Sequence, residues 1–123
     1  MSSPTESTYF RLNRGQQVLI VRISRKRITD EDNVDQFGES LADLVDNEGV
    51  RRMLMDVEEL EYVTSSVLGK LILVHRKLDR VGGLLVFCNV GPDLDEILEA
   101  TRLTTLFHIA PDAEAGRAML ERV

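Results

Sequence analysis

Glu61-Tyr-Val-Thr-Ser-Ser-Val-Leu-Gly-Lys70 lies in the middle of the chain, between a short apolar run and a segment with helical periodicity. The run before it, Met53-Leu-Met-Asp-Val57, has the length and composition of a buried strand. The segment after it has apolar residues at the spacing of one helix face. They are Leu68, Leu71, Ile72 and Leu78, with His75 on the same stripe. A strand, a short connection and a helix in this order are typical of an α/β fold.

Three consecutive hydroxyl residues, Thr64, Ser65 and Ser66, stand where this helix must begin. Thr64 suits the N-cap position, because its side-chain oxygen can accept a hydrogen bond from an otherwise unpaired amide of the first turn. The helix is then expected to run from about Ser65 to Arg80, before a pair of glycines. A structural helix start explains these residues, and a regulatory role for the hydroxyls is the alternative.

The turn resembles the regulatory loop of STAS domains, the anti-anti-sigma factors and stressosome scaffold proteins of bacterial signal transduction and transcription regulation. The usual pattern of that family is Asp-Ser-Ser-Gly-Leu-Gly at the start of the helix after the third strand. Its first serine is the phosphoacceptor. On this pattern Thr64 stands at the aspartate position, Ser65 at the phosphoserine position and Ser66 at the next one.

The resemblance extends beyond the three hydroxyls. Val67 replaces the glycine of the pattern, whereas Leu68 and Gly69 match it. The longer match covers most of the chain and includes two later stretches, Gly82-Gly-Leu-Leu-Val-Phe87 and Leu98-Glu-Ala-Thr-Arg-Leu-Thr-Thr-Leu-Phe107, with Arg102 where glycine is common in the family.

The remaining apolar patterns alternate between strand and helix spacing. Thr8–Leu12 and Gln17–Ile23 read as strands, and their short, glycine-containing connection predicts an antiparallel hairpin. Thr29-Asp-Glu-Asp32 predicts the start of the first helix, because a hydroxyl and a carboxylate three residues apart resemble a capping box. Gly38, inside that helix, indicates close packing with a neighbour. The other expected elements are strands near 52–57, 84–88 and 106–109, a helix beginning at Gly91-Pro-Asp93, and a terminal helix over 113–121.

These patterns together predict an α/β fold with a mixed β-sheet that begins with a hairpin and is packed with about four α-helices. The resemblance implies that residues 8–123 form a single STAS-like domain. Residues 1–7 are rich in serine, threonine and proline, and we expect a disordered tail there.

The composition describes one ordinary globular domain. The chain has 123 residues, of which 43% are hydrophobic, and a net charge of −6, which disfavours binding through a nucleic-acid backbone. The first residues lack the features of a signal peptide, and the apolar runs are too short to span a bilayer. Cys88 is the single cysteine, so no intramolecular disulfide can form. We therefore expect a cytoplasmic protein.

A catalytic role has little support in the residues. His75 lies on the apolar stripe and His108 adjoins Phe107 in an expected strand, so both are interpreted as core or core-edge histidines. Cys88, in an apolar strand, is interpreted as inert packing. The chain has no Cys/His cluster for zinc and no phosphate-binding glycine loop, so we expect no metal, no cofactor and no enzymatic activity.

Asp56 offers a different reading, because an acid at the end of an apolar strand is how response-regulator receivers present their phosphoacceptor. That family also needs acids after its first strand and a lysine after a later one, and these are missing here. Asp56 is therefore expected to be a strand-end residue that accepts hydrogen bonds from nearby amides. A receiver-like domain that uses Asp56 stays as the minor alternative.

The function expected is that of a protein-binding module. The resemblance implies an anti-anti-sigma factor that binds a serine kinase/anti-sigma factor or a scaffold protein. It also implies that phosphorylation of Ser65 switches this binding off. Thr64 and Ser66 are the fallback acceptors. The alternatives are an unphosphorylated STAS scaffold, and a small-ligand-binding or transport-system subunit. A homo-oligomer is compatible with the sequence, which names neither partner nor pathway.

A helical wheel locates a candidate partner-binding face on the helix after the hydroxyl turn. At 100° per residue, Ser66, Gly69 and Leu73 lie opposite the apolar stripe, with Arg76 on the flank. Leu73 is thus an apolar residue among polar ones. One exposed leucine is ordinary, and its use as the anchor for a protein partner is the functional hypothesis.

Overall fold

The computed structural model describes residues 7–15 and 17–123. The expected tail therefore lies outside the described residues except for Ser7, whose hydroxyl accepts a hydrogen bond from the Tyr9 N–H at 3.0 Å. The helices are α1 Val34–Asp46, α2 Ser65–Arg80, α3 Pro92–Ala100 and α4 Ala113–Glu121, with a 3-10 turn over Leu103–Thr105. The strands are β1 Phe10–Arg14, β2 Leu19–Ile23, β3 Arg27–Ile28, β4 Arg52–Asp56, β5 Tyr62–Val63, β6 Leu84–Cys88 and β7 His108–Ala110.

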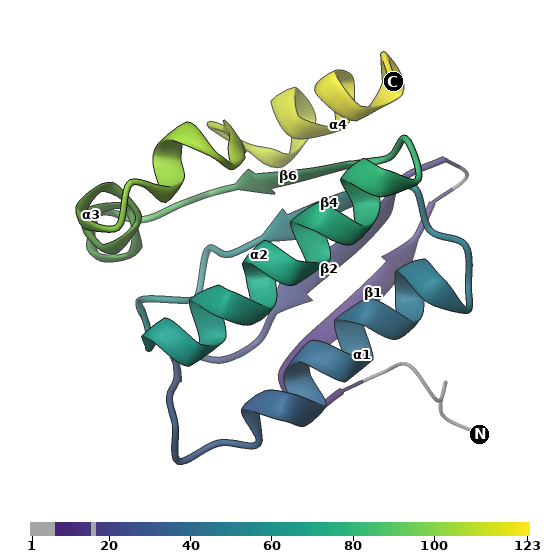
Figure 1. The fold of residues 1–123 in the computed structure, drawn as a ribbon. Coiled ribbons are helices and arrows are strands. Elements are labelled where there is room, and N and C mark those ends of the chain that lie inside the picture. Colours follow the sequence, from purple (N-terminus) through teal and green to yellow (C-terminus); the bar gives the residue numbers. More distant parts are fainter. Residues whose placement is uncertain (1–6, 16) are drawn as a thin grey trace.

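A five-stranded mixed sheet in the order β1-β2-β4-β6-β7 forms the centre of the fold (Figure 1). The first pair is the antiparallel hairpin that the sequence predicts, with Phe10 opposite Ile23. The other pairs are parallel. A further two-stranded sheet pairs β3 with β5 in parallel, with Ile28 opposite Val63. This small sheet was not predicted.

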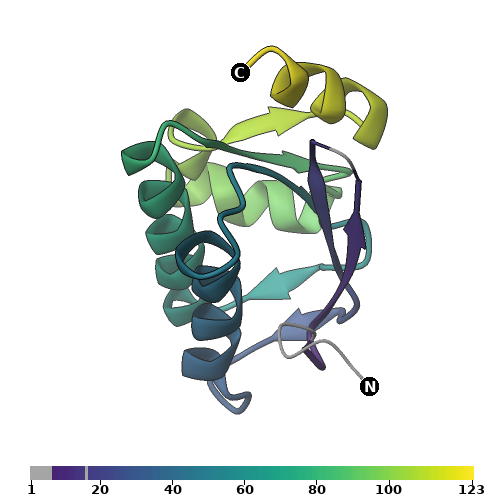
Figure 2. The same cartoon turned by 90° about the vertical axis from the view of Figure 1, so that its right-hand side faces the viewer.

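The helices cover the sheet on both faces, with α1 and α2 side by side on one face and α4 on the other (Figures 1 and 2). Side chains alternate along β4: Met53 and Met55 belong to the large core under α1 and α2, whereas Leu54 packs in a smaller core with Leu120 of α4. A central strand buried on both faces needs apolar residues at consecutive positions, which is why the three central residues of β4 and all five of β6 are apolar.

The start of α1 differs from the prediction. Asn33 is the N-cap residue, and its side chain accepts a hydrogen bond from the Gln36 N–H at 3.0 Å. Thr29 does not cap the helix, because α1 begins only at Val34. The Thr29 N–H does donate to Asp32 Oδ2 at 2.8 Å, as the N-cap amide of a capping box would, but this bond closes a turn before the helix. A short acidic side chain that bonds back to the preceding backbone forms a turn in place of a helix. The segment is therefore a loop between β3 and α1, and the helix start expected at Thr29 is wrong.

The last strand begins later than expected. We predicted it over 106–109, and β7 spans His108–Ala110. The N–H groups of Leu106 and Phe107 both donate to the Leu103 carbonyl, at 3.1 and 2.8 Å. These amides are used by the 3-10 turn and cannot join the ladder of β6.

Gly83 directly precedes β6 and packs against the backbone of Arg51, the last residue before β4. A Cβ atom at this position would lie 2.3 Å from the carbonyl oxygen of Arg51, which also accepts a hydrogen bond from the Leu84 N–H at 2.8 Å. We expect Gly83→Ala to lower the free energy of unfolding by about 1–3 kcal/mol, because a backbone atom must move to make room. Urea unfolding followed by circular dichroism measures this change.

Gly69 supplies the matched control for that measurement. It lies in the interior of α2, it is exposed, and a Cβ atom there would meet nothing within 4 Å. Gly69→Ala should raise the free energy of unfolding by up to about 1 kcal/mol, the difference in helix propensity. Equal stability of Gly83→Ala and the unmodified chain would show that the Arg51 carbonyl does not limit this position.

Candidate functional site

The hydroxyl turn lies at the N-terminus of α2. Thr64 is the N-cap residue, with φ −86° and ψ 169°, and its carbonyl accepts the first helical hydrogen bond from the Leu68 N–H at 3.1 Å. Its hydroxyl makes no capping bond and instead donates to Asp30 Oδ1 at 3.0 Å. The position of the cap is confirmed, and the predicted capping hydrogen bond is wrong. Ser65 and Ser66 follow in the first turn with exposed side chains.

The small β3–β5 sheet fixes this turn against the loop between β3 and α1. The Glu61 N–H donates to the Lys26 carbonyl at 2.8 Å, and the Thr64 N–H donates to the Ile28 carbonyl at 3.3 Å. The two segments therefore leave the small sheet together, one as α2 and the other as the loop that contains Asp30. Strands of two residues carry too little periodicity to be recognised in a sequence.

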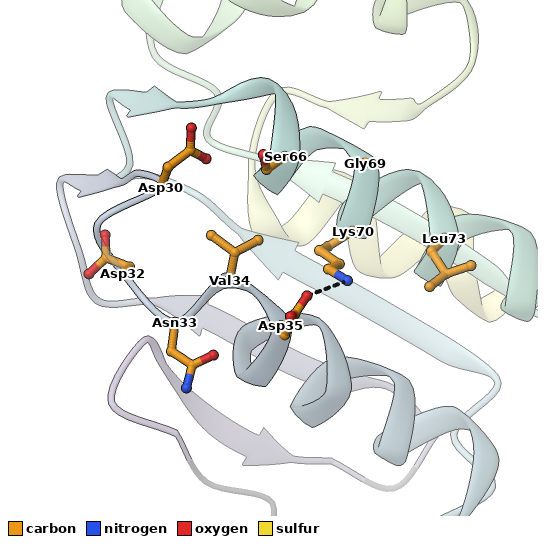
Figure 3. A pocket seen from close by; sticks show the side chains of 9 residues that line it. All are labelled: Asp30, Asp32, Asn33, Val34, Asp35, Ser66, Gly69, Lys70 and Leu73. Carbon is orange, nitrogen blue, oxygen red and sulfur yellow. Dashed lines mark ion pairs between the residues drawn. The ribbon is translucent and has the colours of Figure 1, made fainter.

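A surface hollow of about 670 Å³ lies between this loop and α2 (Figure 3). Three acids contribute to its rim, and each has a different partner. Asp35 forms an ion pair with Lys70 Nζ at 3.0 Å, and Asp32 forms one with Arg25 at 2.9 Å. Asp30 accepts the hydrogen bond from Thr64. The lining residues are Asp30, Asp32, Asn33, Val34, Asp35, Ser66, Gly69, Lys70 and Leu73.

Lys70 reaches Asp35 by crossing α1 at Gly38. A Cβ atom at Gly38 would lie 2.5 Å from Lys70 Cδ, so the absence of a side chain there lets the lysine stem lie directly on the helix. The close packing that the sequence indicated at Gly38 is confirmed. The contact brings α1 and α2 together beside the hollow.

The exposed face of α2 has the composition that the helical wheel predicted. Leu73 is 46% exposed, and Ser66, Gly69 and Arg76 are also exposed. The structure brings Ser66, Gly69 and Leu73 together on the wall of the hollow, whereas Arg76 does not line it. The buried face of α2 holds Val67, Leu68, Leu71, Val74 and Leu78, with Ile72 and His75 half-buried at its border.

Sequence reasoning found the α2 side of this site and missed the acidic loop opposite it. Asp30 and Asp32 were interpreted as part of a helix start, so nothing connected them with residues more than 30 positions later. The available signal was the run of acids after Thr29, which is longer than one helix cap requires.

His75 and His108 differ in exposure. His75 is a core-edge residue, as expected, and its ring packs edge-on against Phe107 with the centroids 5.8 Å apart. Burial lowers its pKa, nearby His108 and Arg76 lower it further, and Asp79 opposes them. His108 itself is exposed, so its expected place in or at the core is wrong. Its ring lies 6.4 Å from the His75 ring, at the end of the sheet where β7 is the edge strand.

Asp56 is a buried acid, 2% exposed, at the end of β4. It accepts hydrogen bonds from the Glu58 N–H at 3.1 Å and from the Asn89 side-chain amide at 3.2 Å, as expected of a strand-end residue. Arg22 Nε lies 3.4 Å from its second carboxylate oxygen. Asp56 thus joins the ends of three neighbouring strands.

Cys88 is fully buried at the end of β6. Burial, with the negative charge of Asp56 as the second cause, raises the pKa of its thiol to about 12. Since the thiolate is the reactive form, we expect the native protein at pH 8 to react with a thiol reagent only on the timescale of unfolding. The same reagent should modify Cys88 at once in denaturant. Rapid reaction without denaturant would contradict the burial of this thiol.

Within residues 7–15 and 17–123, no three His, Cys, Asp or Glu side chains are grouped so that they could hold a metal ion. None of the helices in that part of the chain has the length and apolar character needed to cross a bilayer.

The sequence pattern of the STAS domain matches residues 9–116, so the chain belongs to the STAS domain family. A relative, BtrV of Bordetella bronchiseptica, is 35% identical over 86 residues, which are 70% of this chain and 73% of BtrV. BtrV is named as an anti-sigma factor antagonist.

Two solved structures show the same fold. An anti-sigma factor antagonist from Mycobacterium paratuberculosis has a TM-score of 0.78 at 18% identity, with 98% of this chain and 99% of that chain covered. SpoIIAA of Bacillus in its phosphorylated form has a TM-score of 0.67 at 19% identity, with 89% and 98% covered.

Proposed function

We propose that this chain is a non-enzymatic protein-binding module of the cytoplasm that acts as an anti-sigma factor antagonist. Its partner is a serine kinase/anti-sigma factor, and phosphorylation of Ser65 switches the binding. The observation that carries the proposal is the exposed face of α2, where an apolar side chain, Leu73, lies on the same hollow as the hydroxyl turn. The 35% identity with BtrV supports the choice of partner.

The partner-binding surface consists of Ser66, Gly69, Leu73 and Arg76. Leu73 is nearly half exposed, and burying such a side chain in an interface is worth roughly 1.5–3 kcal/mol. Gly69 has no atoms within 4 Å of the place where a Cβ would stand, so a partner backbone can approach α2 closely there. Arg76 can pair with an acid at the rim of the interface.

Ser65 suits the role of phosphoacceptor because of its position. Its side chain is exposed in the first turn of α2, one residue after the N-cap, so a kinase can reach its hydroxyl without unfolding the helix. Thr64 is less suited, since its hydroxyl is engaged with Asp30. Ser66 is exposed and stays as a second acceptor. That SpoIIAA, with a similar fold, exists in a phosphorylated form supports a switch of this kind.

The test is recovery of the native protein with its partners, followed by mass spectrometry of both. A serine kinase/anti-sigma factor in the complex, and phosphate on Ser65 of the free fraction only, is the expected result. Another STAS protein as the partner, with residues 64–66 unmodified, would replace the proposal by the scaffold function. Recovery with a transport protein or a small ligand would replace it by the third function that the sequence allows.

A further inference from the structure

One side-chain hydrogen bond between described residues connects the loop between β3 and α1 with the hydroxyl turn, and the Asp30 carboxylate accepts it. Asp32 is used within the loop, since one carboxylate oxygen pairs with Arg25 and the other accepts from the Thr29 N–H. Asp35 pairs with Lys70 on the far side of the hollow. Among the ion pairs of residues 7–15 and 17–123, Asp30 alone of these three acids has no cation as a partner. Its carboxylate accepts a hydrogen bond from the Thr64 hydroxyl at 3.0 Å.

The Thr64 hydroxyl carries one hydrogen, so it can donate to one acceptor at a time. In the structure that acceptor is Asp30 Oδ1. A phosphate on Ser65, the next residue, would place three strong acceptor oxygens and about −1.5 to −2 charges beside the same hydroxyl at pH 7. It would compete for the hydrogen and repel the Asp30 carboxylate at the same time. Both effects act against the contact between Thr64 and Asp30.

We propose that the Thr64–Asp30 hydrogen bond is the contact through which a phosphate on Ser65 changes the β3–α1 loop. This inference rests on the proposed phosphorylation of Ser65 and describes how that modification changes the structure around it. In the unmodified protein, Asp30 holds the loop against α2. In the phosphorylated protein that contact opens, and the loop stays attached at its other end, where Arg25 holds Asp32 and the Asn33 N–H donates to the Tyr9 hydroxyl at 2.9 Å.

The consequence concerns the partner-binding surface. The loop forms the wall of the hollow opposite Ser66, Gly69 and Leu73 (Figure 3). When Asp30 moves, the width and charge of that wall change without any change in the buried face of α2. The phosphate then alters two surfaces, the turn that carries it and the loop across the hollow.

Hydrogen exchange of the full chain measures this coupling. Phosphoserine is incorporated at position 65 during synthesis, so no kinase is needed. We expect backbone amides of residues 29–32 to exchange about threefold faster or more in the phosphorylated chain, because the hydrogen bonds of these amides stay within the loop. Amides in the buried strands β4 and β6 should be unchanged.

Three variants identify the contact. Thr64→Val removes the donor, so the loop should exchange faster without phosphate, and phosphoserine should add little. Asp30→Asn keeps an acceptor and removes the charge, so the response to phosphate should fall by about half or more, since repulsion is lost and only competition remains. Asp35→Asn is the matched control, an acid on the same hollow with its own cation, and should respond like the unmodified chain.

An unchanged exchange of residues 29–32 in the phosphorylated chain would overturn the coupling, as would an equal response in Asp30→Asn and Asp35→Asn. Failure of a kinase or partner to act on the chain would overturn the proposed function and leave the exchange result standing. The two proposals can therefore fail separately.

Discussion

Replacing Leu73 by aspartate is expected to abolish partner binding, with an affinity loss of about 100-fold or more, and to leave the melting temperature nearly unchanged. The lost contact is worth roughly 1.5–3 kcal/mol, and an unpaired carboxylate buried in the interface costs several kcal/mol more. Each 1.4 kcal/mol corresponds to a factor of ten in affinity. The fold should tolerate the change, because the side chain is already 46% exposed and outside the core. Calorimetric titration and thermal unfolding of the same samples measure the two effects.

Val81 provides the control for this substitution. It follows the end of the same helix and is 44% exposed, close to the value for Leu73. Val81→Asp introduces the same charge away from the hollow, so partner affinity should stay within about twofold of the unmodified value, as for a surface change outside an interface. A large fall in the melting temperature of Leu73→Asp would mean that Leu73 belongs to the core, and equal binding by both variants would remove α2 from the interface.

Phosphorylation of Ser65 is expected to break the complex without unfolding the domain. The positive end of α2 favours an anion by about 0.3–1 kcal/mol, whereas the acids nearby, Asp30 among them, oppose it. These effects on folding are small and opposite in sign. A phosphate trapped in a dry interface costs several kcal/mol unless it is paired, which corresponds to an affinity loss of about 100-fold or more. The measurement is partner affinity before and after incubation with the cognate kinase and ATP, with peptide mapping of residues 64–66.

Three substitutions at position 65 separate charge from shape. Ser65→Asp should weaken binding, whereas Ser65→Asn, of the same shape without the charge, should bind like the unmodified protein. Ser65→Ala should bind and should accept no phosphate. If Ser65→Asp binds with unmodified affinity and no phosphate is found on residues 64–66, only the scaffold function is left.

Periodicity predicted the elements that bury a continuous face. The strand β6 and the helices α2 and α4 have the expected limits, because each has several apolar residues at one spacing. The predicted start of α1 was wrong, because Thr29 and Asp32 can form either a helix cap or a turn. Two contacts stabilise the turn: Arg25 donates a hydrogen bond to Asp32, and the Tyr9 hydroxyl accepts one from the Asn33 N–H. These are tertiary contacts, and local sequence does not contain them.

The candidate site was predictable only on its helical side. The exposure of Ser66, Gly69 and Leu73 follows from their angular positions on α2, which a sequence specifies. The acid opposite them does not follow, because Asp30 reaches Thr64 through the pairing of β3 with β5, across 34 residues of chain. A register between two-residue strands is set by the packing around them, in which Ile28 and Val63 are buried, and not by their own pattern.

The bond between Thr64 and Asp30 has an evolutionary consequence. A hydroxyl at position 64 is compatible with a carboxylate at position 30, because one donates and the other accepts. The usual pattern of the family has an aspartate at the position of Thr64. Relatives with that aspartate would place two carboxylates against each other if they also kept an acid at position 30. Substitutions at these two positions should therefore be correlated across the family, and in lineages that exchange the threonine for aspartate the acid of the loop should disappear.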